Sequence, residues 1–571
     1  MNYSFLSRTR IFSFFILLFA SLLVVKLFWV QVVHETSYSE RADRQYATPS
    51  SDIFERGTVY FQRNDGQLVS AAVQTSGFKM AINPVQIINA EASYKKLSEK
   101  ITLNHDEFVT KANKKNDPYE EIADRLSKEQ ADSISVLKIP GVYIYKEKCR
   151  FYPGGSLASH ALGFVGYKGN ELGGRYGIER QYNSELSRDK DNPYINFFAE
   201  VFSNIDQTLF KDKVKGGNIV TTIEPAVQGF LEKTLSEVKD KYQIDSIGGI
   251  IMNPQDGSIY AMGVKPDFDI NDFSKVENVS TFSNPLVENV FEFGSVIKPL
   301  VMAAGLDTGV VTAETKYNDT GSVMIEKHQI FNFDKKGRGP NTTMQDVLNQ
   351  SLNTGMVYLF HKLGKQNMYD YMLSYGINNK TGIDLPNETS GLVSGITANL
   401  KNSREIEYAN AAFGQGIALT PMELIRALSS LSNGGNLVVP HVVKSIKYDD
   451  GTEKQMIYPE TRVKISEKTS EEISRMLVTV GDKSPLVKMD HYSIAMKTGT
   501  AQVAKPNGGG YYTDRNMHSF MGFFPAYNPK FIIFLYAINP KGVPYASQTW
   551  STPFSSITKF LLNYYEVPPD R

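Results

Sequence analysis

The stretch NVFEFGSVIKPLVMAAGL, residues 289–306, places a serine and a lysine three positions apart in an apolar setting. The run is helical in character, so Ser295 and Lys298 are expected to share one face of a helix. A serine at a helix start has backbone N–H groups and the positive end of the helix dipole nearby, and both favour developing negative charge. A lysine buried beside it loses preference for its charged form and can act as a base.

A Ser-x-x-Lys pair alone is weak evidence, because the pattern recurs elsewhere, for instance at Ser93/Lys96, Ser135/Lys138, Ser187/Lys190 and Ser556/Lys559. The pair at Ser295 is distinguished by its apolar surroundings and by two further motifs. These are Ser351-Leu352-Asn353 in NQSLNTGM and Lys497-Thr498-Gly499-Thr500 in IAMKTGTAQ.

A second Lys-Thr-Gly occurs at 380–382, in a polar, turn-like stretch with no apolar strand before it. Lys497 follows SIAM, which predicts a strand, so Lys497 and Gly499 are expected to line a cleft. Gly499 leaves room for a substrate to lie along the strand edge.

Composition and charge narrow the class of protein. The chain has 571 residues, which predicts two or more domains, and its 41% hydrophobic and 21% charged residues are typical of a globular protein. Lys+Arg and Asp+Glu both number 61, a balance that gives no reason to expect nucleic acid as a partner. The single cysteine, Cys149, excludes an intrachain disulfide and Cys-based metal sites. We expect no metal and no cofactor.

The N-terminus predicts a membrane anchor. Arg8 and Arg10 precede residues 11–33, whose only charge is Lys26. This length suffices to cross a bilayer at about 1.5 Å per residue. The lack of a clean cleavage signature favours an uncleaved anchor, and the arginines place residues 1–10 in the cytoplasm and everything after Val33 outside the plasma (inner) membrane. The apolar run FIIFLYAI (531–538) is long enough only for a buried strand.

The exported part divides into a non-catalytic module, residues 34–235, and a catalytic domain, residues 236–571. Turn signals predict hairpins at 56–73 and 246–264, and a charged stretch predicts a helical insertion at 105–137. Strand-like segments open and close the second half, and its middle is helical. This layout predicts an α+β domain whose antiparallel sheet is assembled from both ends of the domain.

The three motifs together are the set found in penicillin-binding proteins and β-lactamases. Over nearly its whole length the chain resembles a class B penicillin-binding protein, a peptidoglycan D,D-transpeptidase. RGTVYFQRNDGQLVSA, YPGGSLASHALGFVG, YGIERQYNSEL and FGQGIALTPMEL are similar to further family segments, and VFEFGSVIKP is most like the division-specific branch. The resemblance implies a penicillin-binding transpeptidase fold after an extended, β-rich pedestal or dimerisation module and one transmembrane helix.

The resemblance also implies roles in acyl transfer. Ser295 is the acylated nucleophile, Lys298 activates it, and Ser351 passes a proton toward the leaving D-alanine. The backbone N–H groups of Ser295 and Thr500 form the oxyanion hole.

The remaining motif residues are implied to bind substrate. Asn353 hydrogen-bonds the donor stem peptide, Lys497 supplies positive charge, and Thr498 and Thr500 bind the donor's terminal carboxylate. The implied partners are stem peptides, β-lactams, the lipid bilayer through residues 11–33, and glycan-polymerising and other divisome membrane proteins.

Two departures from the family pattern concern substrate and drug fit. Phe293 stands where relatives keep a proline and Val296 where they often have threonine, and Gln62 replaces a usual aspartate. Three alternatives stay open: an elongation-specific transpeptidase, a β-lactamase-like hydrolase, and an inactive penicillin-binding scaffold or sensor.

Four other residues are given no role in the reaction. His518 is interpreted as a packed or solvent-facing residue, and Cys149 as inert. Glu179 with Arg180 is expected to hold the two modules together.

Overall fold

The computed structural model describes residues 17–19, 21–23, 26, 55–168, 171–188, 216–505 and 510–571. Most of the predicted anchor, residues 11–33, therefore lies outside the described residues, as does the tail of residues 1–10. In the described part of the chain, no helix is both long enough and apolar enough to cross a membrane. The chain forms two compact units, one holding Thr75–Cys149 and the other Arg56–Gln74 with Arg150–Arg571.

The smaller unit packs helices against strands around its own apolar core. Its buried core residues include Met80, Leu97, Phe108 and Ile134, and β4 adds partly buried side chains. The elements are the second half of β2 (Leu68–Ile82), α3 (Ala90–Ser98), α4 (His105–Ala112), β3 (Glu120–Leu126), α5 (Lys128–Ser135) and β4 (Val142–Phe151).

The predicted helical insertion at 105–137 is wrong in its middle. Residues 120–126 form strand β3, which pairs antiparallel with β2, Ile82 opposite Glu120 and Phe78 opposite Leu126. The sequence EEIADRL has helix-like composition, but pairing with a neighbouring strand overrides that weak preference.

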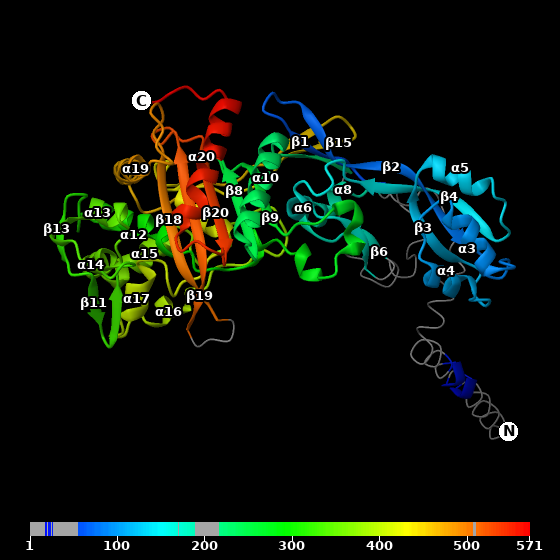
Figure 1. Cartoon of the computed structure of the whole chain (residues 1–571), viewed down its shortest axis with the longest axis horizontal. Coiled ribbons are helices and arrows are strands. Elements are labelled where there is room, and N and C mark those ends of the chain that lie inside the picture. Colours follow the sequence, from blue (N-terminus) through cyan, green and yellow to red (C-terminus); the bar gives the residue numbers. More distant parts are fainter. Residues whose placement is uncertain are drawn as a thin grey trace, which may run out of the picture. The chain divides into compact units, whose positions relative to one another are not determined.

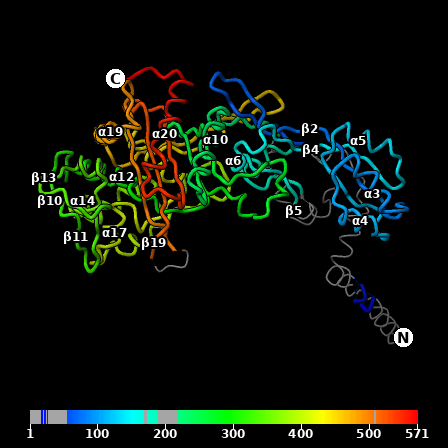
Figure 2. Tube along the Cα trace, in the orientation of Figure 1, coloured from blue at the N-terminus to red at the C-terminus, as the bar shows by residue number. Residues whose placement is uncertain are grey.

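The larger unit is built on a five-stranded antiparallel sheet in the order β18-β19-β20-β8-β9. Its strands are β8 (Ser246–Met252), β9 (Ile259–Lys265), β18 (Ala495–Ala504), β19 (Tyr511–Phe524) and β20 (Phe531–Ile538). The green β8 and β9 therefore lie beside the orange and red strands from the end of the chain (Figures 1 and 2). This confirms a sheet assembled from both ends of the domain, and FIIFLYAI is a buried strand within it.

Helices cover both faces of this sheet. On one face, α20 (Ala546–Tyr564) places Phe554 against Phe520, with ring centroids 4.5 Å apart, and packs on α10 (Pro225–Tyr242). On the other face, Phe293 lies 5.0 Å from Phe534. Phe520 and Leu535 are paired across β19 and β20, so their side chains lie on the same face. Phe534 is the neighbour of Leu535 in β20 and points to the opposite face, so Phe554 and Phe293 contact opposite faces of the sheet.

The second face carries the helical block that holds two of the three motifs. Its helices are α11 (Pro285–Glu288), α12 (Lys298–Asp307), α13 (Met344–Asn349), α14 (Asn353–Leu363), α15 (Lys365–Ser374), α16 (Ser394–Ala398), α17 (Ile406–Ala411), α18 (Pro421–Ser429) and α19 (Glu467–Asp482). Short strands lie among them: β10 (Lys316–Asp319), β11 (Ser322–Ile325), β12 (His328–Phe331), β13 (Gly339–Thr343), β14 (Asn436–Leu437) and β17 (Thr461–Arg462).

The N-terminal part of the larger unit contributes a second sheet. There β16 (Glu453–Gln455), β15 (Val443–Tyr448), β7 (Gly217–Thr221), β1 (Val59–Gln62) and the first half of β2 are neighbours in that order. The predicted hairpin at 56–73 is the β1–β2 pair. The small elements α6 (Ser159–Leu162), β5 (Val165–Lys168), β6 (Glu171–Gly174), α7 (Gly177–Gln181) and α8 (Asn183–Leu186) follow β4.

A buried ion-pair triad ties this part together. Glu179 accepts from Arg56 Nε and from Arg150 Nε, each at 2.6 Å, and all three side chains are almost fully buried. All three residues lie within residues 34–235, so Glu179 links segments of the N-terminal module with one another, and the expectation that its ion pairs hold the two modules together is wrong. A contact to the C-terminal part comes from Tyr182, whose hydroxyl donates to Asp384 at 3.0 Å.

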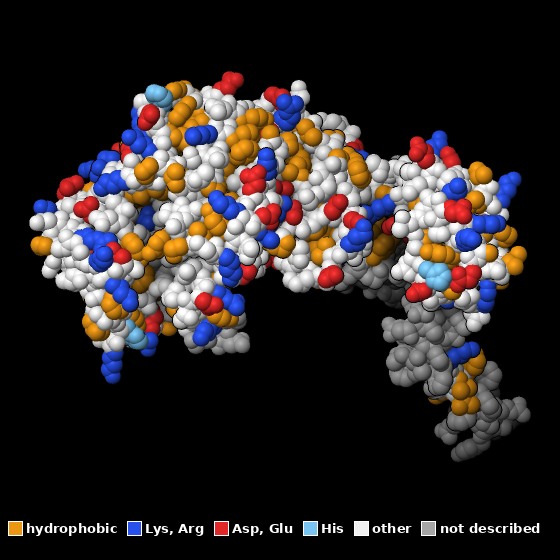
Figure 3. Space-filling view, viewed as in Figure 1, with side chains coloured by type: hydrophobic (Ala, Val, Ile, Leu, Met, Phe, Trp, Pro, Cys, Tyr) orange, Lys and Arg blue, Asp and Glu red, His pale blue; other side chains and the backbone are white. Residues whose placement is uncertain are grey.

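Acidic and basic side chains are interspersed on the face that Figure 3 shows, in keeping with the balanced composition.

Candidate active site

The nucleophile candidate Ser295 lies in a tight turn that leads into a buried helix. Residues Gly294–Ile297 form a 3₁₀ turn, and α12 continues from Lys298. Gly294 has φ of +65°, and its N–H donates to the Gly414 carbonyl at 3.1 Å. Ser295 is half-buried between buried neighbours, and no described residue hydrogen-bonds its hydroxyl. The hydroxyl is thus free to meet a ligand at the start of a helix.

Phe293, just before the turn of the nucleophile, is held by packing. Its side chain is 1% exposed and meets Phe534 edge-on, with Phe291 and Tyr536 nearby. Its carbonyl accepts from the Ser519 hydroxyl at 2.7 Å. The aromatic ring and this hydrogen bond anchor the turn of the nucleophile to strands β19 and β20.

Lys298 is fully buried one turn after Ser295. Its Nζ lies 2.6 Å from the Ser351 carbonyl, 2.9 Å from Asn353 Oδ1 and 3.3 Å from Ser351 Oγ. Burial, reinforced by the nearby charge of Lys497, holds the pKa of Lys298 well below its usual value. Burial therefore favours the neutral amine of Lys298, which is the form that can accept a proton.

Ser351 connects two lysines through one hydroxyl. It lies between α13 and α14, and its φ of +54° is unusual for a residue other than glycine. Its Oγ is 3.3 Å from Lys298 Nζ and 3.0 Å from Lys497 Nζ. The two motifs that are farthest apart in sequence thus meet at this atom.

Lys497 comes from the edge strand β18, as the apolar run before it predicts. It is almost fully buried, and its Nζ also donates to the Thr498 carbonyl at 2.8 Å. Burial lowers the pKa of Lys497 to about 7. Thr500 is exposed, and its Oγ1 accepts from the Ala546 N–H at 3.2 Å.

Gly499 stands where β18 passes the turn of the nucleophile. A Cβ there would lie 2.3 Å from Ser519 Oγ, 2.5 Å from the Phe293 carbonyl oxygen and 3.2 Å from Val296 N. Only glycine permits this approach, so the small residue serves packing of the protein against itself as well as access for a ligand.

Asn353 is held by hydrogen bonds that the sequence around it does not predict. Its side-chain amide donates to the Phe331 carbonyl at 2.9 Å, and its backbone N–H donates to Asn332 Oδ1 at 3.0 Å. Phe331, Asn332 and Ser519 were missed by sequence reasoning. Each acts through geometry that distant chain segments create, and no local pattern marks it.

The second Lys-Thr-Gly, His518 and Cys149 have surroundings that do not suit them to chemistry, although His518 is the cross-strand partner of Thr500. Thr381 of the second Lys-Thr-Gly donates to Glu388, and none of its hydrogen bonds reaches the three motifs. His518 is fully buried and contacts Thr549 at 2.8 Å, and burial lowers its pKa to about 4. Burial also raises the pKa of the Cys149 thiol to about 12, which leaves it a poor nucleophile.

Comparison with known proteins finds two family domains in the chain. The model of the penicillin binding protein transpeptidase domain matches residues 247–558, and that of the penicillin-binding protein dimerisation domain matches residues 54–221.

Two relatives and one solved structure illustrate the similarity. Stage V sporulation protein D of Bacillus subtilis is 30% identical over 515 residues, 87% of this chain and 76% of that protein. Peptidoglycan D,D-transpeptidase FtsI of Buchnera aphidicola is 26% identical over 572 residues, 97% and 94% of the two chains. The crystal structure of penicillin binding protein 3 from Mycobacterium tuberculosis with aztreonam superposes with a TM-score of 0.68 at 21% identity, covering 91% of this chain and 98% of that one.

The transpeptidase model covers more than half of the chain, and the same domain carries the serine, the two buried lysines and the shared hydroxyl. The chain therefore belongs to the penicillin-binding protein transpeptidase family and is a serine-type D,D-transpeptidase.

Proposed function

We propose that this protein cross-links peptidoglycan stem peptides through a serine acyl-enzyme. The observation that carries the proposal is the Ser351 hydroxyl held between two buried lysines, one of them a single helical turn from Ser295. A nucleophile, a base of low basicity and a second proton carrier are the groups that acyl transfer needs.

In the first half-reaction, Lys298 takes the proton of Ser295 while Oγ attacks the carbonyl carbon of the penultimate D-alanine. The tetrahedral intermediate collapses, the C–N bond to the terminal D-alanine breaks, and its nitrogen receives a proton through Ser351. In the second, an amine of a neighbouring stem peptide attacks the ester, its proton returns through the same groups, and Ser295 is released. The reaction exchanges one amide bond for another, so no outside energy source is required.

Charge placement supports the remaining roles. The N–H groups of Ser295 and Thr500 are proposed to stabilise the oxyanion, one from a helix start and one from an edge strand. Lys497 with Thr498 and Thr500 is proposed to bind the terminal carboxylate, and Asn353 the peptide backbone of the donor. β-Lactams are proposed to acylate Ser295 in the same way.

The test is covalent labelling by a fluorescent penicillin followed by intact-protein mass spectrometry. We expect one adduct on wild-type protein, mapped to Ser295, and none on Ser295→Ala. An adduct on the Ser295→Ala variant would refute the nucleophile. Rapid turnover of the adduct would support the hydrolase alternative, and a folded wild type that never acylates would support the scaffold.

A role in septal synthesis is proposed on narrower grounds. It is supported by the VFEFGSVIKP context and by relatives named FtsI, whereas the relative at 30% identity is named for sporulation. We propose a single-pass anchor at residues 11–33, an extracytoplasmic catalytic unit, and partnership with a glycan-polymerising membrane protein of the divisome. Depletion should produce filamentous cells; rounded cells would indicate elongation, and normal cells with defective spores would indicate a sporulation enzyme.

A further inference from the structure

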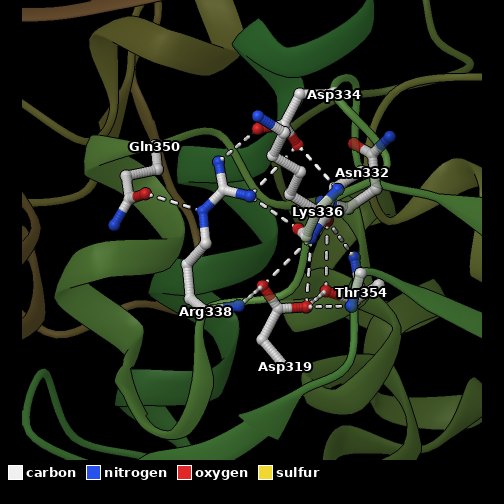
Figure 4. A network of polar contacts seen from close by, with 9 residues as sticks. Asp319, Asn332, Asp334, Lys336, Arg338, Gln350 and Thr354 are labelled. Carbon is white, nitrogen blue, oxygen red and sulfur yellow. Dashed lines mark hydrogen bonds and ion pairs between the residues drawn. The ribbon is translucent and has the colours of Figure 1, made fainter.

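A buried polar cluster lies beneath the segment that carries Ser351 and Asn353. Figure 4 shows it: Asp319 at the end of β10, Asn332 after β12, Arg338 before β13, and Thr354 in the first turn of α14. Asp319, Asn332 and Thr354 are at most 5% exposed. None of these residues belongs to the three motifs.

Asn332 acts as an external cap for helix α14. The residue in the cap position, Leu352, has no side chain that can accept a hydrogen bond. Instead, Asn332 Oδ1 accepts from the backbone N–H groups of Asn353 at 3.0 Å and Thr354 at 3.2 Å. The first free N–H groups of the helix are therefore satisfied by a residue that follows strand β12.

Asp319 sets the orientation of the Asn332 amide. Asn332 Nδ2 donates to both carboxylate oxygens of Asp319 at 3.0 Å and to the Lys336 carbonyl at 3.2 Å. The amide nitrogen faces only acceptors, which leaves the amide oxygen toward the helix. Asp319 also accepts from Thr354 Oγ1 at 2.8 Å, so the carboxylate contacts the helix start directly.

The same cluster holds the chain on the other side of Ser351. The backbone N–H of Arg338 donates to Asp319 at 3.0 Å, and its Nε donates to Gln350 Oε1 at 2.9 Å. Gln350 immediately precedes Ser351. Residues 350 and 353 are thus fixed by one connected set of hydrogen bonds, with the left-handed Ser351 between them.

From this arrangement we infer that Asn332, oriented by Asp319, is a positioning residue for the acylation of Ser295. It fixes the start of α14, and with it the Ser351 hydroxyl and the Asn353 amide that contact Lys298 Nζ. The inference rests on the proposed function, because it assigns Asn332 to the same proton-transfer groups. A displacement of about 1 Å in such groups can cost on the order of 100-fold in rate.

The test compares Asn332→Ala with a matched control, Asn433→Ala. Asn433 is also a buried asparagine of the larger unit, whose side chain makes three hydrogen bonds to Pro254 and Asn436 and none to the motifs. The second-order rate constant of acylation by a fluorescent penicillin is measured per folded molecule, beside the thermal unfolding temperature. We expect at least a tenfold loss of rate in Asn332→Ala and less than a twofold loss in Asn433→Ala, at similar unfolding temperatures. Equal rates in the two variants would overturn the inference.

An exchange of partners tests the role of Asp319. Asn332→Asp places a second carboxylate against Asp319 and should lose rate, and the double variant Asn332→Asp, Asp319→Asn should recover part of it by restoring an amide–carboxylate pair. A double variant no faster than Asn332→Asp would overturn the part assigned to Asp319. If Asn332→Asp does not fold, the comparison of Asn332→Ala with Asn433→Ala still tests the role of Asn332. Failure of wild-type protein to acylate would instead refute the proposed function, so the two failures are distinguishable.

Discussion

Lys298 Nζ lies 2.6 Å from the backbone carbonyl oxygen of Ser351. A carbonyl can only accept, and so can Asn353 Oδ1 at 2.9 Å, so these two partners occupy two N–H bonds of the amine. A neutral amine has two such bonds and one lone pair. The lone pair is then left for a hydroxyl proton, which is the state that a base for Ser295 requires.

The pH profile of acylation should be bell-shaped. The pKa of Lys298 lies well below its usual value because of burial and the charge of Lys497, so its neutral form appears at lower pH than that of an exposed lysine. The pKa of Lys497 is about 7, so its charge is lost as pH rises further and attraction for a carboxylate weakens. Stopped-flow acylation between pH 4 and 10 measures both limbs. Lys497→Arg should move the falling limb to higher pH, whereas a rate that climbs steadily to pH 10 in wild type would contradict the assignment.

Gly499→Ala should slow acylation by about 100-fold, because a methyl group 2.5 Å from the Phe293 carbonyl must displace the turn of the nucleophile. Adding Ser519→Ala relieves the 2.3 Å clash but not the carbonyl contact, so recovery should be partial. Gly229→Ala is the control, because an added Cβ in helix α10 would make only an ordinary contact, 4.0 Å from Leu157 Cδ1, and it should gain about 0.5–1 kcal/mol of stability at unchanged rate. A wild-type acylation rate in Gly499→Ala would contradict this prediction, because it would show that the turn of the nucleophile accommodates the methyl group.

Comparing Ser351→Ala with Ser351→Gly separates the effect of losing the hydroxyl from the effect of relieving backbone strain. Both remove the hydroxyl between the lysines and should lose about 100-fold or more in acylation rate. Only glycine relieves the left-handed backbone, so it should be about 1 kcal/mol more stable than the alanine variant in urea unfolding. Equal stability would mean that Ser351 carries no backbone strain.

Phe293→Pro should weaken the fold more than the reaction. The buried ring is lost, at a cost of about 3–5 kcal/mol. No described residue accepts a hydrogen bond from the Phe293 N–H, and its φ of −90° is within about 25° of the value proline fixes. Urea unfolding and the acylation rate per folded molecule measure the two effects. Loss of rate without loss of stability would contradict a packing role.

Glu179→Gln should cost about 3–5 kcal/mol by leaving two buried arginines without their anion. Burial alone would raise the pKa of Glu179, but Arg150 and Arg56 outweigh it, and the net pKa is lowered. A depressed carboxyl pKa adds stability above its unfolded value, and that stability is lost as pH falls. The unfolding temperature of wild type should therefore drop more steeply below pH 5 than that of the variant. Parallel curves would contradict this.

Features that depend on residues close together in the sequence could be predicted, whereas features that depend on residues far apart in the sequence could not. FIIFLYAI and the hairpin at 246–264 were predictable because apolar runs and Asp-Gly turns are local signals. Residues 120–126 were misread, since their strand exists only through pairing with β2. Motif spacing indicated Ser351 and Lys497, but Asn332 could not be found, because its role depends on two strands meeting the start of α14.

Because the sheet is assembled from both ends of the domain, its strands are synthesised at widely separated times. Ser295 and Ser351 leave the ribosome before Lys497, and β8 and β9 wait for β20, which lies between β8 and β19. Until β18–β20 have been synthesised, the nucleophile therefore has no second lysine, no Gly499 strand and no partner for its Phe293 carbonyl. A nascent chain that ends before these strands holds Ser295 and Ser351 but not the complete site.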